Sequence, residues 1–599
     1  MATAQQKRSV FFIGFHGADG ICTGGPREAG ERADLESLPL DQPQPARVDE
    51  LTVRARTSAD LRRVTVLDHL LPAAPVVQVI IEEIPDWRQP PLPSPGDEAL
   101  WFHLRSAATS REGERGWCVR TVFDLDADAG TVVAAVVRML EGHRLNGGAL
   151  LAASAGPGAV QKRSSYATAD LLEPLVKRTE LVAMDLSRQA GRHHGVPLDE
   201  RSVNPIGFDP GAGGPVAVLE WTEHGPALTA DGCELLRPES GSALTDADIA
   251  RLRWLRGIRL APLPSPSGDD EALARLVVSC AAAGIPLTAS SPHGWSSLLG
   301  ETLALLIAGV KEEELSDPLT REEHSIRQRR HALRHHGMRR FWLETLREWG
   351  HMQAAPLRPS VSVLLCTKRP ELVDFALRQI ARQRGVDMEV VLALHGVPWP
   401  EEVARRALAN SSLRIVPVTI PAHYLLGEAL NTAAARASGS YIAKMDDDDW
   451  YGPDHLGDAL LAQAYSGADV VGCPQEFVYL ESLDMTVRRR RGRTETPCAL
   501  TPEGLLPGGT LVISRTALEG VGGFRAVARF EDTELSNAVR AAGGRAYRMH
   551  GLNYLYRRRA PSMHTYTATN DHFLKENSRR WAGRFFNQLM EADSTEPYG

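Results

Sequence analysis

Apolar strands alternate with helical segments from residue 360 onward, and this alternation constrains the fold more than any other feature of the sequence. Continuous apolar runs stand at 361–367, 388–396, 413–420 and 440–445, and stretches with helical spacing lie between them. Strands that are apolar along their whole length are typical of parallel sheets covered by helices on both faces. The pattern predicts a doubly wound α/β sheet, in which ligands bind beyond the carboxyl ends of the strands.

Four consecutive aspartates, Asp446–Asp449, follow the last of these strands. Unpaired neighbouring carboxylates raise one another's pKa and lower stability, and a divalent cation would remove that cost. Mg²⁺ and Mn²⁺ take carboxylate oxygens together with phosphate oxygens and waters. An EF-hand calcium loop does not fit, because position five would be Trp450 or Tyr451 in the two registers. The run therefore predicts a metal–phosphate site, with a solvated acidic turn as the alternative.

The composition narrows the class of protein. The chain has 599 residues, which at about 150 residues per domain suggests more than one domain. Hydrophobic residues make up 43% and charged residues 24%, and the net charge of −8 comes without the broad basic excess of a nucleic-acid binder. No apolar run approaches the ~20 residues of a transmembrane helix. Seven scattered cysteines without CxxC spacing argue against a disulfide framework or a zinc site. We therefore expect a cytoplasmic protein without a nucleic-acid partner.

The clearest boundary along the chain lies near residues 350–360. Residues 1–350 also alternate strands and helices, and we expect a separate α/β region there. It would form either one domain or two Rossmann-like lobes split near residue 245. The remaining expected parts are a linker at 351–360, a C-terminal domain at 361–590 and a tail at 591–599.

A charged amphipathic segment from Thr320 to Trp349 ends the first region. It opens with the sequence of a capping box, Thr320 and Glu323, in which the two side chains would cap the first turn of a helix. Arginines and histidines fill most of its surface, and its histidines lack an evident carboxylate partner for a metal site. The segment therefore predicts a helix with a solvated basic face.

Five segments of the C-terminal region form a recognisable series. They are CTKRPELVDFALRQIARQ, GEALNTAAARASGSYIAKMDDDD, GGTLVISRTALEGVGGF, FEDTELSNAVRAAG and RRRAPSMHTY. In this order they resemble the family 2 glycosyltransferases, which have the GT-A fold, and the resemblance covers about residues 360–590. The resemblance implies a Rossmann-like, doubly wound mixed sheet. It also implies an enzyme that moves a sugar from a nucleoside-diphosphate donor to an acceptor hydroxyl, with inversion, by a metal-assisted single displacement.

The resemblance assigns roles to the acids of the run. The family pattern Asp-x-Asp-Asp falls on Asp446, Asp448 and Asp449. It implies that Asp446 contacts the ribose or a metal-bound water, that Asp448 is the main ligand of Mg²⁺ or Mn²⁺, and that Asp449 supports the nucleotide site. Asp447 falls on the variable position, so its substitution by alanine is expected to cost least.

Two further segments supply the remaining implied roles. Asp532 would be the general base and Glu531 its neighbour, while His564 would complete the metal shell. The chemistry needs these groups, because a cation stabilises the leaving diphosphate and a carboxylate takes the proton of the attacking hydroxyl. The alternatives are a helix-capping role for Asp532 and an ordinary surface position for His564.

The sequence departs from the family at the end of the second strand. An acid that helps to read the base commonly stands there, whereas this chain has His395 followed by Gly396. Either His395 replaces that contact or it fills a turn. Thr367 and Arg369, which follow the first strand, are the other candidates for nucleotide contact.

An arginine cluster, VRRRRGR at 487–493, lies between the aspartate run and the third of the five segments. It would hold a diphosphate, a phosphorylated acceptor or an anionic membrane surface, or form a solvated loop. The expected partners are a nucleotide sugar and a glycan, lipid-linked or small-molecule acceptor, with peripheral contact at the inner face of a membrane as one option. The alternatives in other classes are a nucleotidylyltransferase and a non-catalytic glycan-binding scaffold. The absence of glycines beside the first strand disfavours the nucleotidylyltransferase, and the retained acids disfavour the scaffold.

Overall fold

The structure is a computed structural model, and it divides the chain into two compact units. One contains Met1–Asn204, Gly211–Ser316 and His331–Leu357, and the other contains Pro205–Pro210, Asp317–Arg330 and Arg358–Gly599. The described residues are 7–15, 32–39, 47–65, 67–85, 104–141, 144–145, 149–154, 181–185, 198, 200, 203, 207–208, 213–222, 224–237, 244, 246–263, 270–337, 340, 359–399, 413–489, 498–499, 506–559, 569–575 and 579–591. Among them, no helix combines the length and the apolar character needed to cross a membrane.

The first unit contains a mixed sheet of six described strands in the order β2-β1-β3-β4-β6-β5. The strands are β1 (Arg8–Ile13), β2 (Arg32–Asp34), β3 (Glu50–Thr57), β4 (Ala74–Glu83), β5 (Leu104–Glu112) and β6 (Gly116–Ala127). The first four in this order pair in parallel, and β6 and β5 continue antiparallel. Helices α1 (Ser58–Val64) and α3 (Ala129–Glu141) share an apolar core with this sheet. The expected α/β character of the region is confirmed.

A second mixed sheet in this unit has the order β12-β11-β10-β13-β14. Its elements are β10 (Val216–Thr222), β11 (Gly225–Ala230), β12 (Cys233–Leu236), α6 (Asp246–Leu252), β13 (Gly257–Leu260), α7 (Asp270–Ala282), β14 (Leu287–Ala289), α8 (Trp295–Leu299) and α9 (Glu301–Ala308). A small sheet joins β7 (Arg144–Leu145), β8 (Ala149–Ser154) and β9 (Leu181–Asp185). The expected lobe boundary near residue 245 falls between β12 and α6, inside the second sheet, because β13 returns to pair with β10.

The C-terminal unit is built on a mixed sheet of eight described strands in the order β17-β16-β15-β18-β24-β20-β25-β23. The strands are β15 (Ser360–Thr367), β16 (Asp387–His395), β17 (Arg414–Ile420), β18 (Tyr441–Lys444), β20 (Val470–Gly472), β23 (Cys498–Ala499), β24 (Val512–Ser514) and β25 (Ala546–Arg548). The first four in this order are parallel, and β24 runs antiparallel to β18. The four strands expected from the apolar runs are thus present, in a doubly wound arrangement.

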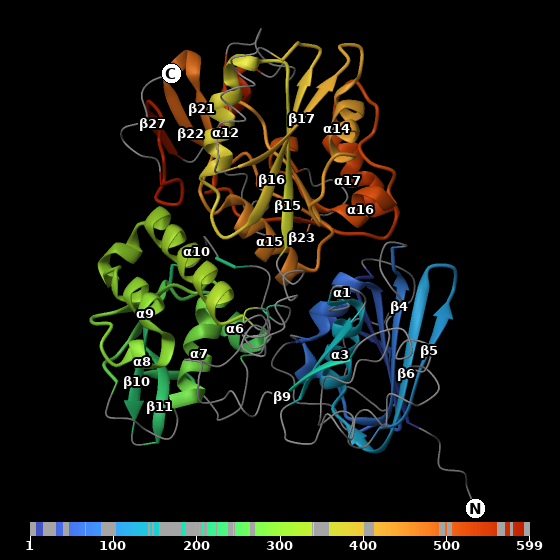
Figure 1. The fold of residues 1–599 in the computed structure, drawn as a ribbon. Helices are drawn as coiled ribbons and strands as arrows, with labels where there is room; N and C mark the ends of the chain where they lie inside the picture. The colour runs from blue at the N-terminus through green and yellow to red at the C-terminus, as the bar shows by residue number, and fades with distance from the viewer. Residues whose placement is uncertain are drawn as a thin grey trace, which may run out of the picture. The chain divides into compact units, whose positions relative to one another are not determined.

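Helices cover both faces of this sheet (Figure 1). They are α12 (Val373–Ala381), α14 (Leu426–Ala434), α15 (His455–Ser466), α16 (Arg515–Gly520) and α17 (Glu531–Ala541), with the short α18 (Asn570–Leu574) near the end of the chain. In Figure 1, α14, α16 and α17 lie together on one side, and α12 lies on the other. A second sheet has the order β19-β26-β21-β22-β27. Its strands are β19 (Trp450–Tyr451), β21 (Phe477–Leu480), β22 (Met485–Arg488), β26 (Tyr554–Arg558) and β27 (Arg579–Ala582).

The order of the parallel strands fixes where a ligand can bind. From β15 the chain moves outward to β16 and β17, and then returns to place β18 on the opposite side of β15. The direction of winding therefore reverses between β15 and β18. In doubly wound sheets the crevice beyond the carboxyl ends at such a point is the usual ligand site. Thr367 ends β15 and Asp446–Asp449 follow β18, so both lie at this crevice.

The helix α10 (Pro318–His335) differs from the expectation at its start and on its surface. Asp317, not Thr320, caps the helix, because its Oδ2 accepts from the amide and the hydroxyl of Thr320, both at 2.9 Å. Glu323 is not part of a capping box, since its Oε1 accepts from the amide of Gln588 at 3.1 Å. Proline suits the first turn that follows such a cap.

The expected solvated basic face of this helix is wrong for the residues that pack into the C-terminal unit. Polar side chains at Glu322, Glu323, His324, Gln328 and Arg329 are all buried. The segment 317–330 packs against the second sheet of that unit, where its apolar side chains join a buried cluster. The cluster contains Leu319, Ile326, Trp450, Phe477, Tyr479, Leu552, Leu555, Leu589 and Met590. The charge pattern was misleading because these charges have partners inside the fold.

Candidate active site

Lys444 ends β18 and forms the first contact of the aspartate run. Its Nζ donates to Asp446 Oδ1 at 2.8 Å, and only 9% of the lysine side chain is exposed. Burial by itself would lower the pKa of Lys444, but the negative charges of Asp446, Glu531 and Asp532 outweigh it, so the pKa is raised above its ordinary value. Lys444 therefore lies close to both acidic segments that the sequence singled out.

A turn of two glycines passes between those acidic segments. A Cβ on Gly508 would lie 3.1 Å from Asp532 Oδ2 and 3.1 Å from Lys444 Nζ. A Cβ on Gly509 would lie 2.5 Å from Asp446 Oδ2, so a side chain there would collide with the carboxylate. The structure thus brings Asp446 and Asp532, which are far apart in sequence, to the two sides of one narrow turn.

Tyr451 ties the aspartate run to this turn. Its hydroxyl donates to the carbonyl of Gly509 at 2.8 Å and accepts from the amide of Asp446, also at 2.8 Å. The ring is fully buried, so the two bonds are shielded from water. Such a shielded pair fixes the backbone of Asp446 against the glycine turn.

Arg369, beyond the end of β15, holds the next two acids. Its Nη1 donates to Asp448 Oδ2 at 2.8 Å and its Nε donates to Asp447 Oδ2 at 3.1 Å. Its Nη2 also pairs with Asp447 Oδ1, and the hydroxyl of Thr367 donates to Asp447 Oδ2. Burial opposes the charge of the guanidinium, but Asp448 and Asp447 raise the pKa of Arg369 above its ordinary value. Thr367 and Arg369, proposed nucleotide contacts, are thus placed directly on the aspartate run.

Asp449 has a different environment from its neighbours. Its side chain is almost fully buried; Oδ2 accepts from the hydroxyl of Tyr554 at 2.6 Å, and Oδ1 accepts from the amide of Arg557 at 2.8 Å. Burial, together with the negative charges of Asp448 and Asp446, raises the pKa of Asp449 well above its ordinary value. These contacts anchor strand β26 to the aspartate run.

Asp532 lies in the first turn of α17, where carboxylates are favoured by the helix dipole. The N-cap residue is Phe530, so the alternative of Asp532 as the helix cap does not apply. Its Oδ1 accepts from the amide of Thr533 at 2.7 Å. Burial raises the pKa of the neighbouring Glu531, and the charge of Lys444 partly offsets this effect.

Phe530 itself is an unusual residue at this position. Its backbone is left-handed, with φ of 68°, although it is not a glycine. Its side chain is 62% exposed. Non-glycine residues in this region are strained by about 1–3 kcal/mol and cluster at functional sites. An exposed aromatic ring therefore stands next to the acids at the start of α17.

The other candidates are less informative about the site. His395 ends β16; it is buried, and its Nε2 lies 2.9 Å from the carbonyl oxygen of Tyr424. Burial and the charge of Lys368 lower the pKa of His395. The imidazole thus joins the end of β16 to the segment after β17, and a nucleotide contact for it stays a prediction. His564 lies outside the described residues.

The first two arginines of the expected basic cluster have structural partners. Arg488 pairs with Glu476 through Nε at 2.7 Å and with Glu322 through Nη2 at 2.5 Å. Arg489 is buried, and its guanidinium lies 5.1 Å from the centre of the Phe573 ring. Neither is part of a solvated loop. The rest of the cluster, 490–493, lies outside the described residues.

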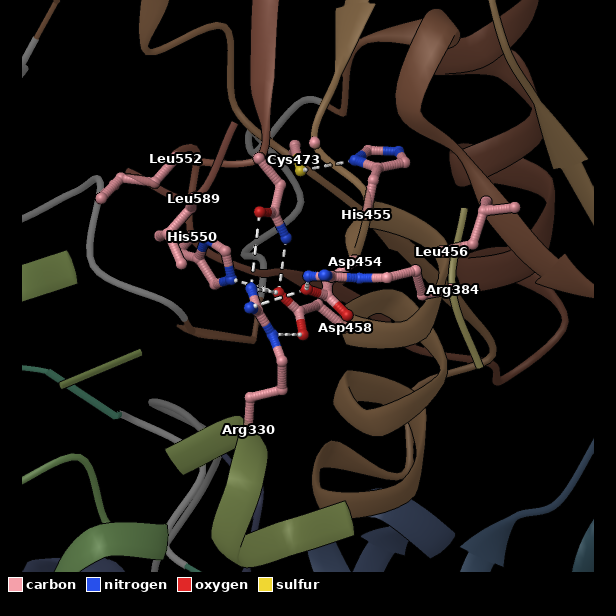
Figure 2. A network of polar contacts seen from close by, with 12 residues as sticks. Arg330, Arg384, Asp454, His455, Leu456, Asp458, Cys473, His550, Leu552 and Leu589 are labelled. Carbon is pink, nitrogen blue, oxygen red and sulfur yellow. Dashed lines mark hydrogen bonds and ion pairs between the residues drawn. The ribbon is translucent and has the colours of Figure 1, made fainter. Parts of the chain in front are cut away.

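Figure 2 shows a buried ionic network around the start of α15. Arg330 of α10 makes two bonds of 2.7 Å to the carboxylate of Asp458 and one of 3.0 Å to Asp454. Arg384 also donates to Asp454 at 2.6 Å, and His550 Nε2 lies 3.0 Å from Asp458 Oδ2. Both aspartates lie at the start of α15, a few residues after the aspartate run. The network therefore fixes the helix that follows the run.

Sequence reasoning missed Lys444 and Arg330. A signal for Lys444 was present, because a lysine inside an otherwise apolar strand is costly to bury unless an acid pairs with it. No local pattern pointed to Arg330, since its partners stand 124 and 128 residues away.

The acids of the run offer few ligands for a divalent metal. Among the residues that the structure describes, no group of three or more His, Cys, Asp or Glu is arranged to hold a metal ion. Asp446 and Asp448 nevertheless lie in one loop at the crevice, and Mg²⁺ commonly uses one or two carboxylates with substrate phosphates and waters. The residues therefore fit a cation that is held jointly with a diphosphate, and they do not fit an all-protein metal cage.

The contacts of Asp447 lead to a prediction that reverses the expectation from its variable position. Asp447 is 4% exposed and bonded to Thr367 and Arg369. Replacing it by alanine would leave these two donors without their partner, which typically costs about 1–3 kcal/mol. We expect a loss of that size in the free energy of unfolding, measured by chemical denaturation. Asp387, which is exposed at the amino end of β16, away from the crevice, is the control. Equal losses of unfolding free energy in Asp447→Ala and Asp387→Ala would contradict the prediction.

Comparison with known proteins agrees with the resemblance found in the motifs. Residues 362–525 match the model of the family described as glycosyl transferase family 2. No curated protein matches the chain. A mannosyltransferase, PcManGT from Pyrobaculum calidifontis in complex with GDP-Man and Mn²⁺, is 20% identical, with a TM-score of 0.28 over 34% of this chain and 58% of that one. TarS 1–349 from S. aureus in complex with UDP-GlcNAc is 18% identical, with a TM-score of 0.28 over 34% and 59%.

The likeness to the family rests on the match in sequence. This chain spans less than two thirds of the length of either solved structure. The matched residues run from β15 through the aspartate run to the segment that precedes α17. They lie on the doubly wound mixed sheet that the resemblance implied. Residues 362–525 therefore resemble the family 2 glycosyltransferases in sequence.

Proposed function

We propose that the C-terminal unit transfers a sugar from a nucleoside-diphosphate donor to an acceptor hydroxyl. One observation carries this proposal: Asp446 and Asp532 approach the same glycine turn beside Lys444, at the crevice between β15 and β18. A group that handles the donor and a group that can act as a base thereby stand close together. Both are needed for direct transfer in a single active site.

The donor would lie beyond the carboxyl ends of β15 and β18. We assign Asp446 to the ribose or a metal-bound water and Asp448 to the metal, with His564 as a further proposed ligand. Mg²⁺ or Mn²⁺ held there would stabilise the charge of the leaving diphosphate. Arg369 adds positive charge next to Asp448, and a guanidinium suits phosphate oxygens. Asp449, buried against Tyr554, would shape this site without reaching the ligand.

Asp532 would accept the proton of the acceptor hydroxyl as it attacks the sugar. Its carboxylate lies near the ammonium group of Lys444, beside the glycine turn. One base and one displacement imply inversion at the anomeric carbon. Glu531 would assist as a neighbouring acid. The exposed ring of Phe530 beside these acids suits the apolar face of a sugar, which supports a glycan acceptor over the lipid-linked and small-molecule options.

A thermal-shift panel tests the donor half of this proposal. The full chain would be melted with UDP, GDP and their sugar conjugates, each with and without Mn²⁺. We expect one nucleotide to raise the melting temperature in a Mn²⁺-dependent manner, because a ligand at 100 times its Kd adds about 2.7 kcal/mol of stability. Asp448→Asn should lose the Mn²⁺-dependent part of the shift, and Asp387→Asn, exposed at the opposite end of β16, should keep it. The absence of any Mn²⁺-dependent shift would favour a non-catalytic scaffold.

A further inference from the structure

Arg369 stands where a cation would otherwise balance the aspartate run. It bonds to Asp447 through Nε and to Asp448 through Nη1. We propose that Arg369 is an internal counter-cation, so that a divalent metal binds Asp448 only together with a nucleoside diphosphate that draws this guanidinium away. The proposal rests on the proposed function and adds an order to it, in which metal and nucleotide bind as a pair.

Three of the four acids of the run already pair with a cationic side chain of the chain itself. Lys444 pairs with Asp446, and Arg369 pairs with both Asp447 and Asp448. Both acids held by Arg369 are buried, at 4% and 5% exposure. Buried carboxylates without a partner are strongly unfavourable, so these pairings weaken the attraction of the run for a metal that arrives without an anion.

A metal ion arriving alone would meet repulsion at this site. To bind Oδ2 of Asp448 the ion must replace the bond from Nη1 of Arg369, and the displaced guanidinium would then face a doubly charged ion. Arg559 adds to this repulsion, because it is close enough for the charge of Asp448 to affect its pKa, which burial and Arg557 together lower. The same geometry therefore disfavours a metal that comes without an anion.

A diphosphate removes this barrier because it offers Nη1 of Arg369 another anionic partner. A guanidinium N–H donates to phosphate oxygens as it does to carboxylate oxygens. Only the Nη1 contact to Asp448 needs to change. Nε stays on Asp447, and the backbone amide of Arg369 stays bonded to the Thr367 hydroxyl at 2.8 Å. Asp447 would thus anchor the arginine while Asp448 is released to the metal.

Measurement of Mn²⁺ binding to the full chain tests the proposal. The electron paramagnetic resonance signal reports the concentration of the free ion. For the wild type we expect the affinity for Mn²⁺ to rise at least tenfold when UDP or GDP is added. Arg369→Gln should raise the nucleotide-free affinity at least tenfold and reduce the gain from the nucleotide. Arg369→Lys, which keeps the charge without the fork, should lie between the two. Arg414, at the start of β17, pairs with the carboxylate of Glu389 in β16. Arg414→Gln removes this other guanidinium–carboxylate pair and should match the wild type.

Two results would overturn the proposal. One is an equal or lower nucleotide-free affinity in Arg369→Gln than in the wild type. The other is a wild-type affinity for Mn²⁺ that does not change when a saturating nucleotide is added. This second result needs no variant, so it applies even if Arg369→Gln fails to fold. If no nucleotide binds at all, the proposed function fails, whereas the nucleotide-free comparison of the two chains still decides whether Arg369 competes with the metal.

Discussion

Asp532→Asn is expected to lower the rate of sugar transfer by about 10²–10⁴-fold, the range that a positioned general base contributes. The amide has the shape of the carboxylate but cannot take the proton of the acceptor hydroxyl. The fold should tolerate the change, since the hydrogen bonds of the Asp532 carboxylate go to its neighbour Thr533. An asparagine oxygen can accept the same bond from the Thr533 amide. Single-turnover rates with the donor identified by thermal shift measure the loss.

Donor binding separates a catalytic effect from a structural one. Mn²⁺-dependent nucleotide affinity should stay within about twofold in Asp532→Asn, because a base acts on the acceptor and adds nothing to uniform donor binding. Glu534→Gln is the matched control: it removes a carboxylate from the same first turn of α17, but from an exposed position. It should transfer sugar at the wild-type rate. Turnover retained in Asp532→Asn would remove Asp532 from the role of base.

The position of the site was predictable because it follows from the order of strands. The apolar runs at 361–367 and 440–445 correspond to β15 and β18, and their carboxyl ends meet at the crevice. A rule about parallel sheets and a count of apolar residues are sufficient for that step. The family of this segment was likewise readable from motifs whose order is local to the chain.

The bonding partners of the individual aspartates were not predictable in the same way. The spacing of the aspartates indicates which positions match the family pattern. The environment of most of these carboxylates, however, is set by a partner residue that is distant in sequence. Arg369 stands 78 residues before Asp447 and Tyr554 stands 105 residues after Asp449. The motif therefore located the acids. It did not indicate that Asp447, at the variable position of the motif, is buried and bonded to Thr367 and Arg369, because those residues are distant in sequence.

The same limit explains α10. Its charged side chains suggested a water-facing helix because sequence displays charge and not pairing. In the structure Glu322 pairs with Arg488, and Arg330 with Asp454 and Asp458. A domain beginning at residue 361, as the motifs suggested, would leave Glu322 and Arg330 outside. In the structure Asp317–Arg330 belongs to the same compact unit as Arg358–Gly599.

Arg330→Met should therefore destabilise the C-terminal unit by about 3 kcal/mol, the lower part of the range for breaking a buried ion pair by removing one partner. The side chain of Arg330 is 10% exposed, and those of Asp454 and Asp458 are 3% and 7% exposed. Arg384 and His550 remain as partial partners of the two aspartates, which keeps the expected loss at the lower end. Chemical denaturation measures it. Arg327→Met is the control, because Arg327 is exposed on the same helix and its guanidinium donates to the neutral side chain of Gln588 at 3.3 Å.

The pH dependence of stability tests the cause of that loss. Burial alone would raise the pKa of Asp458, but Arg330 and His550 outweigh it, so the pKa lies below its ordinary value. A carboxyl with a lowered pKa in the folded state stabilises the fold above the ordinary pKa of about 4, and this contribution is lost as the pH falls below it. The wild type should therefore lose stability on acidification from about pH 5 to pH 3 more steeply than Arg330→Met. Parallel curves would show that Arg330 contributes through the packing of its aliphatic stem and not through the charges of Asp454 and Asp458.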